Sequence, residues 1–146
     1  MKKVSSIILI LFLAVSNITQ AQYKIGQWVD YLPYTSCVSV SKGNGKIYAA
    51  TGVGAFSIDI HDNSYSRLNK VQGLNDVDVT MVKFNTHNNT LLIIYSNSNI
   101  DVIKGNTITN FSDIKRKNIT ADKTVYNVSF YNEFAYLATG FGVVVF

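Results

Sequence analysis

The chain has 146 residues, of which 47% are hydrophobic and 15% are charged, and its formal net charge is +4. Lys2 and Lys3 contribute two of the 13 basic side chains, so residues 22–146 hold 13 − 2 = 11 basic residues against 9 acidic ones. This near-neutral balance does not resemble that of a nucleic-acid-binding protein, which needs a basic face with clustered Lys and Arg.

Residues 1–21 have the organisation of a secretory signal peptide. Lys2 and Lys3 are followed by the apolar run IILILFLAV (7–15), and the small residues of TQA (19–21) precede Gln22. This pattern predicts cleavage after Ala21 and export to the periplasm or the outer-membrane cell surface. No later run has the roughly 20 apolar residues of a membrane-spanning helix, so we expect a soluble mature fragment with no transmembrane segment.

The segment IGQWVDYLPYTS (25–36) contains the only Trp and the only Pro. In a β-propeller an N-terminal strand often completes the last blade, and this aromatic segment is a candidate for that role. Cys37 follows it and has no second cysteine with which to form a bridge. We therefore expect Cys37 to be a small buried residue in a strand.

From about residue 36 the chain repeats with a period of 44 residues. IYAATGVGAF (47–56) returns as AYLATGFGVV (135–144), 88 residues later, and LLIIYSNSNI begins halfway between them at Leu91. Three copies align without a gap. This alignment equates Asn44 with Asn88 and Asn132, Thr51 with Tyr95 and Thr139, Val38 with Val82 and Tyr126, and Val40 with Phe84 and Val128.

The glycines of the repeat admit two interpretations, a phosphate-binding loop or a hairpin turn. In the middle copy they become Ser96 and Ser98, although close approach of a phosphate to the backbone would require glycine. The Gly-Lys-Ser/Thr ending of a P-loop is also missing from the sequence. Gly, Asn and Ser are the residues of tight turns, so hairpin turns are the favoured interpretation.

Within each copy the apolar residues alternate, as in Phe56, Ile58 and Ile60, which predicts short antiparallel strands. LLII (91–94) is apolar on both faces, as expected for a strand packed between two sheets. A repeat of 40 to 45 residues with four strands has the size of a β-propeller blade. The sequence therefore predicts an all-β fold: an incomplete N-terminal β-propeller domain over 22–146, with about 2.5–3 four-stranded blades. The chain stops inside the run VVVF, so we expect a larger protein, and an exposed, aggregation-prone blade face in this fragment.

The sequence contains no recognisable catalytic constellation, and it predicts no catalytic, cofactor-binding or metal-binding residue. His61 lies close to Asp59 and Asp62, but this segment lacks the pattern of a calcium loop. Lys115, Arg116 and Lys117 form the one local basic cluster. A solvated connection is the favoured interpretation, and a contact for phosphate or an acidic glycan is the alternative. A ligand site is expected at an axial end, in loops such as 61–64 or 112–123.

Several segments together resemble the amino-terminal propeller of PorZ-type proteins of the type IX secretion system of Bacteroidota. They are WVDYLPY (28–34), KIYAATGVGAFSID (46–59), GLNDVDVTMVKFNTHNNTLLIIYSNSNIDVI (73–103), DIKRKNITADKTV (113–125) and AYLATGFGVVVF (135–146). The resemblance implies a surface-exposed, non-catalytic protein that acts beside the sortase and other proteins of the attachment complex. It also implies binding of anionic lipopolysaccharide and its delivery to the sortase, which attaches it to secreted cargo. The family has no short site motif, so no residue is assigned to a site.

Two other classes remain open. GLND (73–76) and the YAATG strand end also resemble the regulator propeller repeat of periplasmic, glycan-sensing domains in hybrid two-component histidine kinases. That repeat usually has Trp where this chain has Tyr48, Leu92 and Tyr136, and its Gly-Leu connector is absent at Lys117 and Asn118. The third class, a propeller enzyme, would need acidic or His clusters at one end of the blades.

Overall fold

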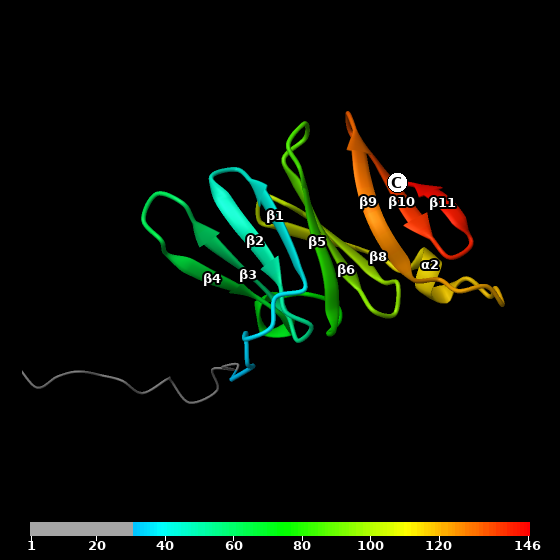
Figure 1. Cartoon of the computed structure of the whole chain (residues 1–146), viewed down its shortest axis with the longest axis horizontal. Helices are drawn as coiled ribbons and strands as arrows, with labels where there is room; N and C mark the ends of the chain where they lie inside the picture. The colour runs from blue at the N-terminus through cyan, green and yellow to red at the C-terminus, as the bar shows by residue number, and fades with distance from the viewer. Residues whose placement is uncertain (1–30) are drawn as a thin grey trace, which may run out of the picture.

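The computed structural model describes residues 31–146, which form three antiparallel β-sheets lying side by side (Figure 1). The signal peptide predicted at 1–21 and the first part of the segment 25–36 lie outside the described residues. The first sheet holds β1 (Ser39–Gly43), β2 (Lys46–Ala50), β3 (Ala55–Asp59) and β4 (Tyr65–Leu68). The second holds β5 (Val79–Asn85), β6 (Thr90–Tyr95), β7 (Ile100–Lys104) and β8 (Thr107–Phe111), and the third holds β9 (Val125–Tyr131), β10 (Phe134–Thr139) and β11 (Gly142–Val145).

Each sheet is a meander in which strands adjacent in sequence pair with one another, as in a propeller blade. The predicted all-β propeller fragment is therefore confirmed. Single helical turns lie in the two connections between sheets: η1 (Lys70–Gln72) and α2 (Asp113–Arg116). Among residues 31–146, no helix has the length and hydropathy required to cross a bilayer.

The predicted turns close the hairpins. Asn44 and Gly45 have φ of 48° and 68°, and Asn132 has φ of 52°, values that Asn and Gly adopt at the lowest cost. Residues 51–54 and 140–141 connect β2 to β3 and β10 to β11, so the repeated glycines are hairpin glycines. The phosphate-loop interpretation of these segments is thereby excluded.

Two hydrophobic cores hold the three sheets together. Val82, Leu91 and Ile93 pack against the first sheet, whereas Leu92 and Ile94 pack against the third. All six residues of β6 are buried, which confirms that LLII is a strand between two sheets. Each sheet thus has a front face toward the preceding sheet and a rear face toward the next one.

The gapless alignment of the three copies is wrong in the middle copy. Val40, Val82 and Val128 pair with Ala49, Ile93 and Leu137, which are themselves 44 residues apart. Val82, and not Phe84, is therefore the equivalent of Val40. The reason is the turn after β5, which has four residues (86–89) where the turns 44–45 and 132–133 have two.

The two outermost faces of the sheets are apolar and exposed. On the front face of the first sheet, Val40 is 56% exposed, whereas its equivalents Val82 and Val128 are 0% and 5% exposed. On the rear face of the third sheet the exposed side chains are Tyr131, Phe134, Tyr136, Val143 and Val145. Each outer sheet therefore presents the kind of surface that the middle sheet buries on both sides.

Cys37 does not have the predicted environment. It is exposed, it precedes β1, and its Sγ lies 3.4 Å from the carbonyl oxygen of Ser39. The prediction assumed that the first strand begins before residue 37, but β1 begins only at Ser39. Cys37 therefore lies ahead of the packed part of the first sheet.

Candidate functional site

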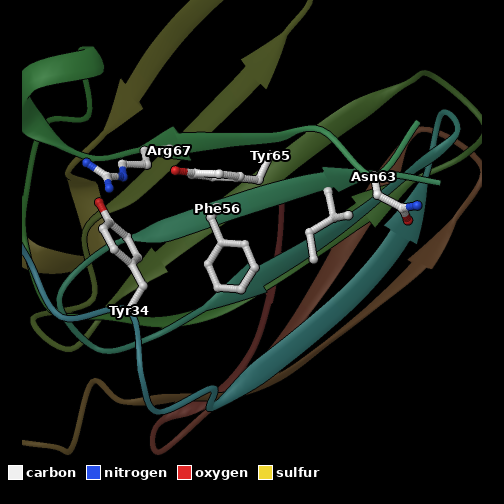
Figure 2. A pocket seen from close by; sticks show the side chains of 6 residues that line it. Tyr34, Phe56, Asn63, Tyr65 and Arg67 are labelled. Carbon is white, nitrogen blue, oxygen red and sulfur yellow. The ribbon is translucent and has the colours of Figure 1, made fainter. Parts of the chain in front are cut away.

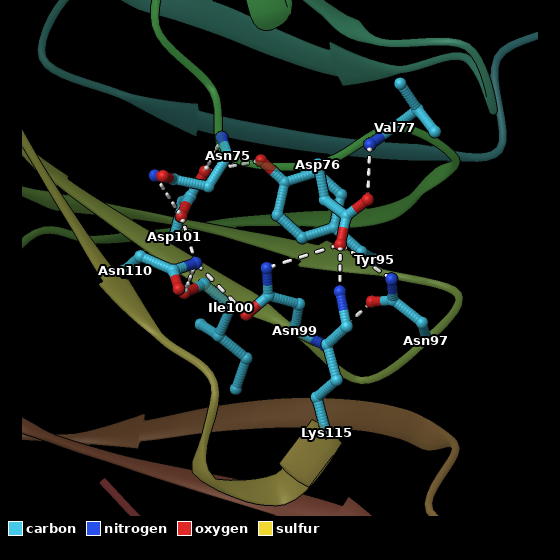
Figure 3. Close-up of polar contacts among 10 residues, drawn as sticks. All are labelled: Asn75, Asp76, Val77, Tyr95, Asn97, Asn99, Ile100, Asp101, Asn110 and Lys115. Carbon is cyan, nitrogen blue, oxygen red and sulfur yellow. Dashed lines mark hydrogen bonds and ion pairs between the residues drawn. The ribbon is translucent and has the colours of Figure 1, made fainter.

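A network of hydrogen-bonded polar side chains, some buried and others exposed, lies at one end of the second sheet (Figure 3). At its centre is Asp101 of β7, which is fully buried. Asp101 Oδ1 accepts hydrogen bonds from Asn110 Nδ2 at 2.7 Å and from Asn75 Nδ2 at 3.0 Å. Its Oδ2 accepts from the backbone N–H of Asn75 at 2.8 Å and from the hydroxyl of Tyr95 at 2.5 Å. A buried carboxylate is thus held by four donors, as burial of a charge requires.

Asp76 is the second carboxylate of the network, and it joins the second sheet to α2 (Figure 3). Its Oδ2 accepts from Lys115 Nζ at 2.7 Å, from Asn97 Nδ2 at 2.6 Å and from Asn99 Nδ2 at 3.4 Å, and the N–H of Val77 donates to its Oδ1 at 3.1 Å. Burial alone would raise the pKa of Asp76. The hydrogen bonds from Lys115, Asn97 and Val77, together with the charge of Lys115, outweigh it and hold that pKa well below its usual range.

The network attaches the connection before β5 to the second sheet, because Asn75 donates to Asp101 of β7. Burial raises the pKa of Tyr95, and the hydrogen bond to Asp101 and the charge of Asp101 raise it further, so Tyr95 remains a protonated donor. Both oxygens of Asp101 accept two donors each, whereas Asp76 Oδ2 accepts three and Asp76 Oδ1 accepts only the N–H of Val77. A general base needs a free lone pair near a substrate proton, so the fully buried Asp101 is not suited to that role.

We expect acid to weaken the contact between Asp76 and Lys115. A carboxyl group whose pKa is depressed in the folded state stabilises the fold above its unfolded pKa of about 3.9 and loses that contribution as the pH falls toward the folded pKa. Asp76→Asn should therefore lower stability at pH 7 and flatten the decline in stability below about pH 4. Urea unfolding between pH 2 and 7 measures both effects. Parallel pH curves for the two proteins would contradict the assignment.

The predicted basic cluster is exposed, but its members are not equivalent. Lys115 is bound to Asp76, and its carbonyl oxygen accepts from Lys123 Nζ at 3.0 Å. Arg116 lies 3.5 Å from Asp113, with both side chains largely exposed. Lys117 ends α2 and is exposed. Lys115 therefore anchors the connection, and Arg116 and Lys117 remain as its exposed cations.

The two loops expected to contribute to a ligand site lie at opposite ends of the strands. Residues 61–64 connect β3 to β4 at the end that carries the turns 44–45, 86–89 and 132–133, whereas 112–123 lies at the end that carries the Asp76 network. They cannot form one site. Asp59 and Asp62 accept the backbone N–H groups of His61 and Ser64 at 2.9 and 2.8 Å and so shape the turn. Within residues 31–146, no three His, Cys, Asp or Glu side chains are grouped as metal ligands.

A hollow of about 370 Å³ lies on the front face of the first sheet (Figure 2). The rings of Tyr34 and Phe56 meet edge to face at 6.1 Å, and the Arg67 guanidinium lies 5.6 Å from the centre of the Tyr34 ring. Tyr65 also lines the hollow. The equivalent faces of the other two sheets are buried against their neighbours, so we interpret this hollow as a sheet-packing surface.

Sequence reasoning did not find the Asp76 and Asp101 network. Its members come from the connection before β5, from β6, β7 and β8, from the turn 96–99 and from α2. GLND at 73–76 stands out in the sequence only as part of a family pattern. The usable signal was the density of Asn and Asp between residues 75 and 110, which is typical of turns and gives no pairing between them.

Comparison with known proteins identifies a family. A family model described as the type IX secretion system PorZ N-terminal β-propeller domain matches residues 47–146. A solved structure of PorZ from Porphyromonas gingivalis, described as an essential bacterial surface component of the type IX secretion system, is similar with a TM-score of 0.77 and 24% sequence identity. The similarity covers 82% of this chain and 16% of that one, so the chain spans about a sixth of that protein. No curated protein sequence matches the chain significantly.

Proposed function

The chain belongs to the PorZ N-terminal β-propeller family of the type IX secretion system, and from this premise we propose that it is part of a non-catalytic, surface-exposed adaptor. In this proposal the protein acts in the attachment complex beside the sortase. It binds anionic lipopolysaccharide and delivers it to the sortase, which attaches it to secreted cargo. The protein is exported through the signal peptide predicted at residues 1–21.

The observation that carries the proposal is the difference between the three basic residues of the connection 112–123: Lys115 is paired with Asp76, whereas Arg116 and Lys117 are exposed. The ion pair between Lys115 and Asp76 fixes α2 on the second sheet, and Arg116 and Lys117 follow on the same short element. A rigid segment with exposed cations suits an anionic polymer, because little side-chain and loop entropy is lost on binding. The burial of Asp101 and the four donors on its oxygens support an adaptor over an enzyme.

The family match supports the secretion protein over the sensor propeller. These two classes of protein differ in the domains downstream of the propeller. Reading the gene beyond the codon for Phe146 distinguishes them: a second propeller and a C-terminal β-sandwich domain are expected. A transmembrane helix and then a histidine kinase would replace the proposal with the sensor.

Charge reversal at Arg116 and Lys117 tests the site in the full-length protein. Arg116→Glu and Lys117→Glu should each weaken binding to purified anionic lipopolysaccharide severalfold at low salt, and the difference should shrink as salt screens the charges. Lys104→Glu is the matched control, since Lys104 is exposed at the other end of the second sheet. Lys115 is left unchanged because it holds Asp76.

Binding curves and their salt dependence can be measured by surface plasmon resonance. Equal losses in Lys104→Glu would indicate a general charge effect and remove this site from the proposal. Unchanged binding in the two α2 variants would do the same.

A further inference from the structure

A hollow of about 300 Å³ lies at the end of the strands that carries the Asp76 network. Its apolar lining residues are Tyr31, Leu32, Val53, Val71 and Val77. They lie in the segment before β1, in the turn 51–54, in η1 and in the connection before β5, and neither hydrophobic core includes them. Because they are at the ends of the strands, the packing of one sheet face on the next leaves them uncovered.

Two of these residues, Val71 and Val77, are apolar although the local structure does not require it. They are 46% and 47% exposed. The connection already has a buried apolar residue, Leu74, which packs in the core between the first two sheets. Val77 lies two residues before β5, and the residue at the same distance before β9 is Lys123. The backbone thus accepts a polar residue at this position, and contiguous exposed apolar surface that the fold does not need is typical of an interaction site.

Hydrogen bonds hold the loops around the hollow in place. Asn69 Oδ1 accepts the N–H of Val71 at 2.8 Å at the start of η1. The N–H of Val77 donates to Asp76 Oδ1 at 3.1 Å, and Asp76 is itself held by the polar network. The turn 51–54 is closed by two hydrogen bonds between its first and last residues. The hollow is therefore preformed, and little loop entropy is lost when a ligand binds.

The charge at the hollow is positive. Lys70 is the one charged side chain among the described residues that line it, and it is exposed and has no ion pair within residues 31–146. Of the two acidic residues beside Val77, Asp76 is bound to Lys115 and Asp78 does not line the hollow. Electrostatic complementarity therefore favours a ligand with a carboxylate next to its apolar part.

We propose that this hollow is a docking site for a partner protein. One large apolar side chain of the partner enters the hollow, and an Asp or Glu next to it in the partner pairs with Lys70. A buried apolar side chain inside a polar rim is the usual organisation of the strongest part of a protein interface. The volume is at the low end of the range for small-molecule sites, about 300–1,000 Å³, so the hollow suits a side chain better than the long alkyl chain of a lipid.

This site goes beyond the proposed function and shares no residue with the connection 112–123. The two sites can therefore be tested independently. Loss of lipopolysaccharide binding in the Arg116 and Lys117 variants says nothing about the hollow, and the reverse also holds.

The test uses the full-length protein and a library of random peptides displayed on phage. The enriched peptides should share a large apolar side chain beside Asp or Glu. Binding of one such peptide is then measured by fluorescence anisotropy. Val77→Gln should raise its Kd about five- to tenfold, as expected for a contact at the centre of an interface. Lys70→Gln should raise Kd about two- to fivefold, and this difference should shrink as salt screens the charge.

The matched controls are Ile60→Gln and Lys104→Gln. Ile60 is 45% exposed, close to the value for Val77, and Lys104 is exposed like Lys70. Both lie at the other end of the strands. Their Kd should equal that of the unchanged protein. In methyl NMR spectra the signals of Val71 and Val77 should shift when the peptide is added, which a loss of binding through misfolding would not produce.

Four results would overturn the proposal. The first is the absence of enriched peptides, and the second is equal effects in the hollow and control variants. The third is displacement of the peptide by laurate at a similar concentration, which would assign the hollow to an alkyl chain. The fourth is peptide binding only after deletion of residues 22–30, which would assign the hollow to that segment of the same chain.

Discussion

Asp101→Ala should destabilise the domain by about 1–3 kcal/mol, the cost of leaving a buried donor without its acceptor. Asp101 and Tyr95 are both buried, so removal of the carboxylate leaves the Tyr95 hydroxyl without its acceptor, whereas the exposed residues Asn75 and Asn110 can bind water instead. Urea denaturation and thermal unfolding of the full-length protein measure the loss. Asn75 lies in the connection before β5, so hydrogen exchange of that connection should also accelerate.

Asp113→Ala is the control for this change. Asp113 is also a carboxylate, but its side chain is 82% exposed and its ion pair with Arg116 is long, at 3.5 Å. Exposed pairs of this kind contribute about 0–1 kcal/mol. Asp101→Asn should cause a stability loss between these two. Its amide keeps one acceptor oxygen, but its NH₂ group would face the donors that the carboxylate now accepts. A stability loss for Asp101→Ala as small as that for Asp113→Ala would contradict the role given to the network.

Gly43→Ala should lower the free energy of unfolding by about 1–3 kcal/mol, the usual cost of overpacking, because it crowds the contact between the first and second sheets. The added Cβ would lie 1.9 Å from Cδ1 of Phe84. The Phe84 ring is stacked against the Tyr48 ring, so it has little room to move away from the new methyl group. The effect is measured as the change in urea midpoint. The backbone at Gly43 is in a strand and outside the positive-φ region, so steric contact is the cause tested.

A double-mutant cycle identifies Phe84 as the obstacle. Phe84→Leu should destabilise by itself, because apolar area is lost from the seam. Combined with Gly43→Ala, the total loss should be smaller than the sum of the two single losses, since the shorter side chain leaves room for the methyl group. Additive losses would show that the added methyl group disturbs something other than the Phe84 ring.

Much of the local structure could be predicted from the sequence, because it depends on short-range chemistry. Asn44 and Gly45 adopt left-handed backbone angles at little cost, so their turn was recognisable without a fold. The alternation of Phe56 and Ile58 marks one face of β3, and the double-sided apolar run 91–94 is the middle strand β6. The period of 44 residues predicted the sheet as a repeated unit.

Insertions within the repeat were invisible to a gapless alignment. The turn 86–89 has two extra residues, and these are polar like the rest of the turn. They do not disturb the apolar pattern of β6, but they move β5 by two positions relative to the alignment. Cys37 was misjudged for a related reason, because composition does not show where the first strand begins. Both errors concern boundaries, where local sequence is least informative.

The sequence by itself determined the strands, their turns and the need for neighbouring sheets, because each follows from the alternation of residues along a few positions. Only the tertiary structure decided which polar residues meet. Asp76 reaches Lys115 across 39 positions, and Asn75 reaches Asp101 across 26. Such contacts depend on how whole sheets pack, since the spacing of residues along the chain does not encode their distance across it.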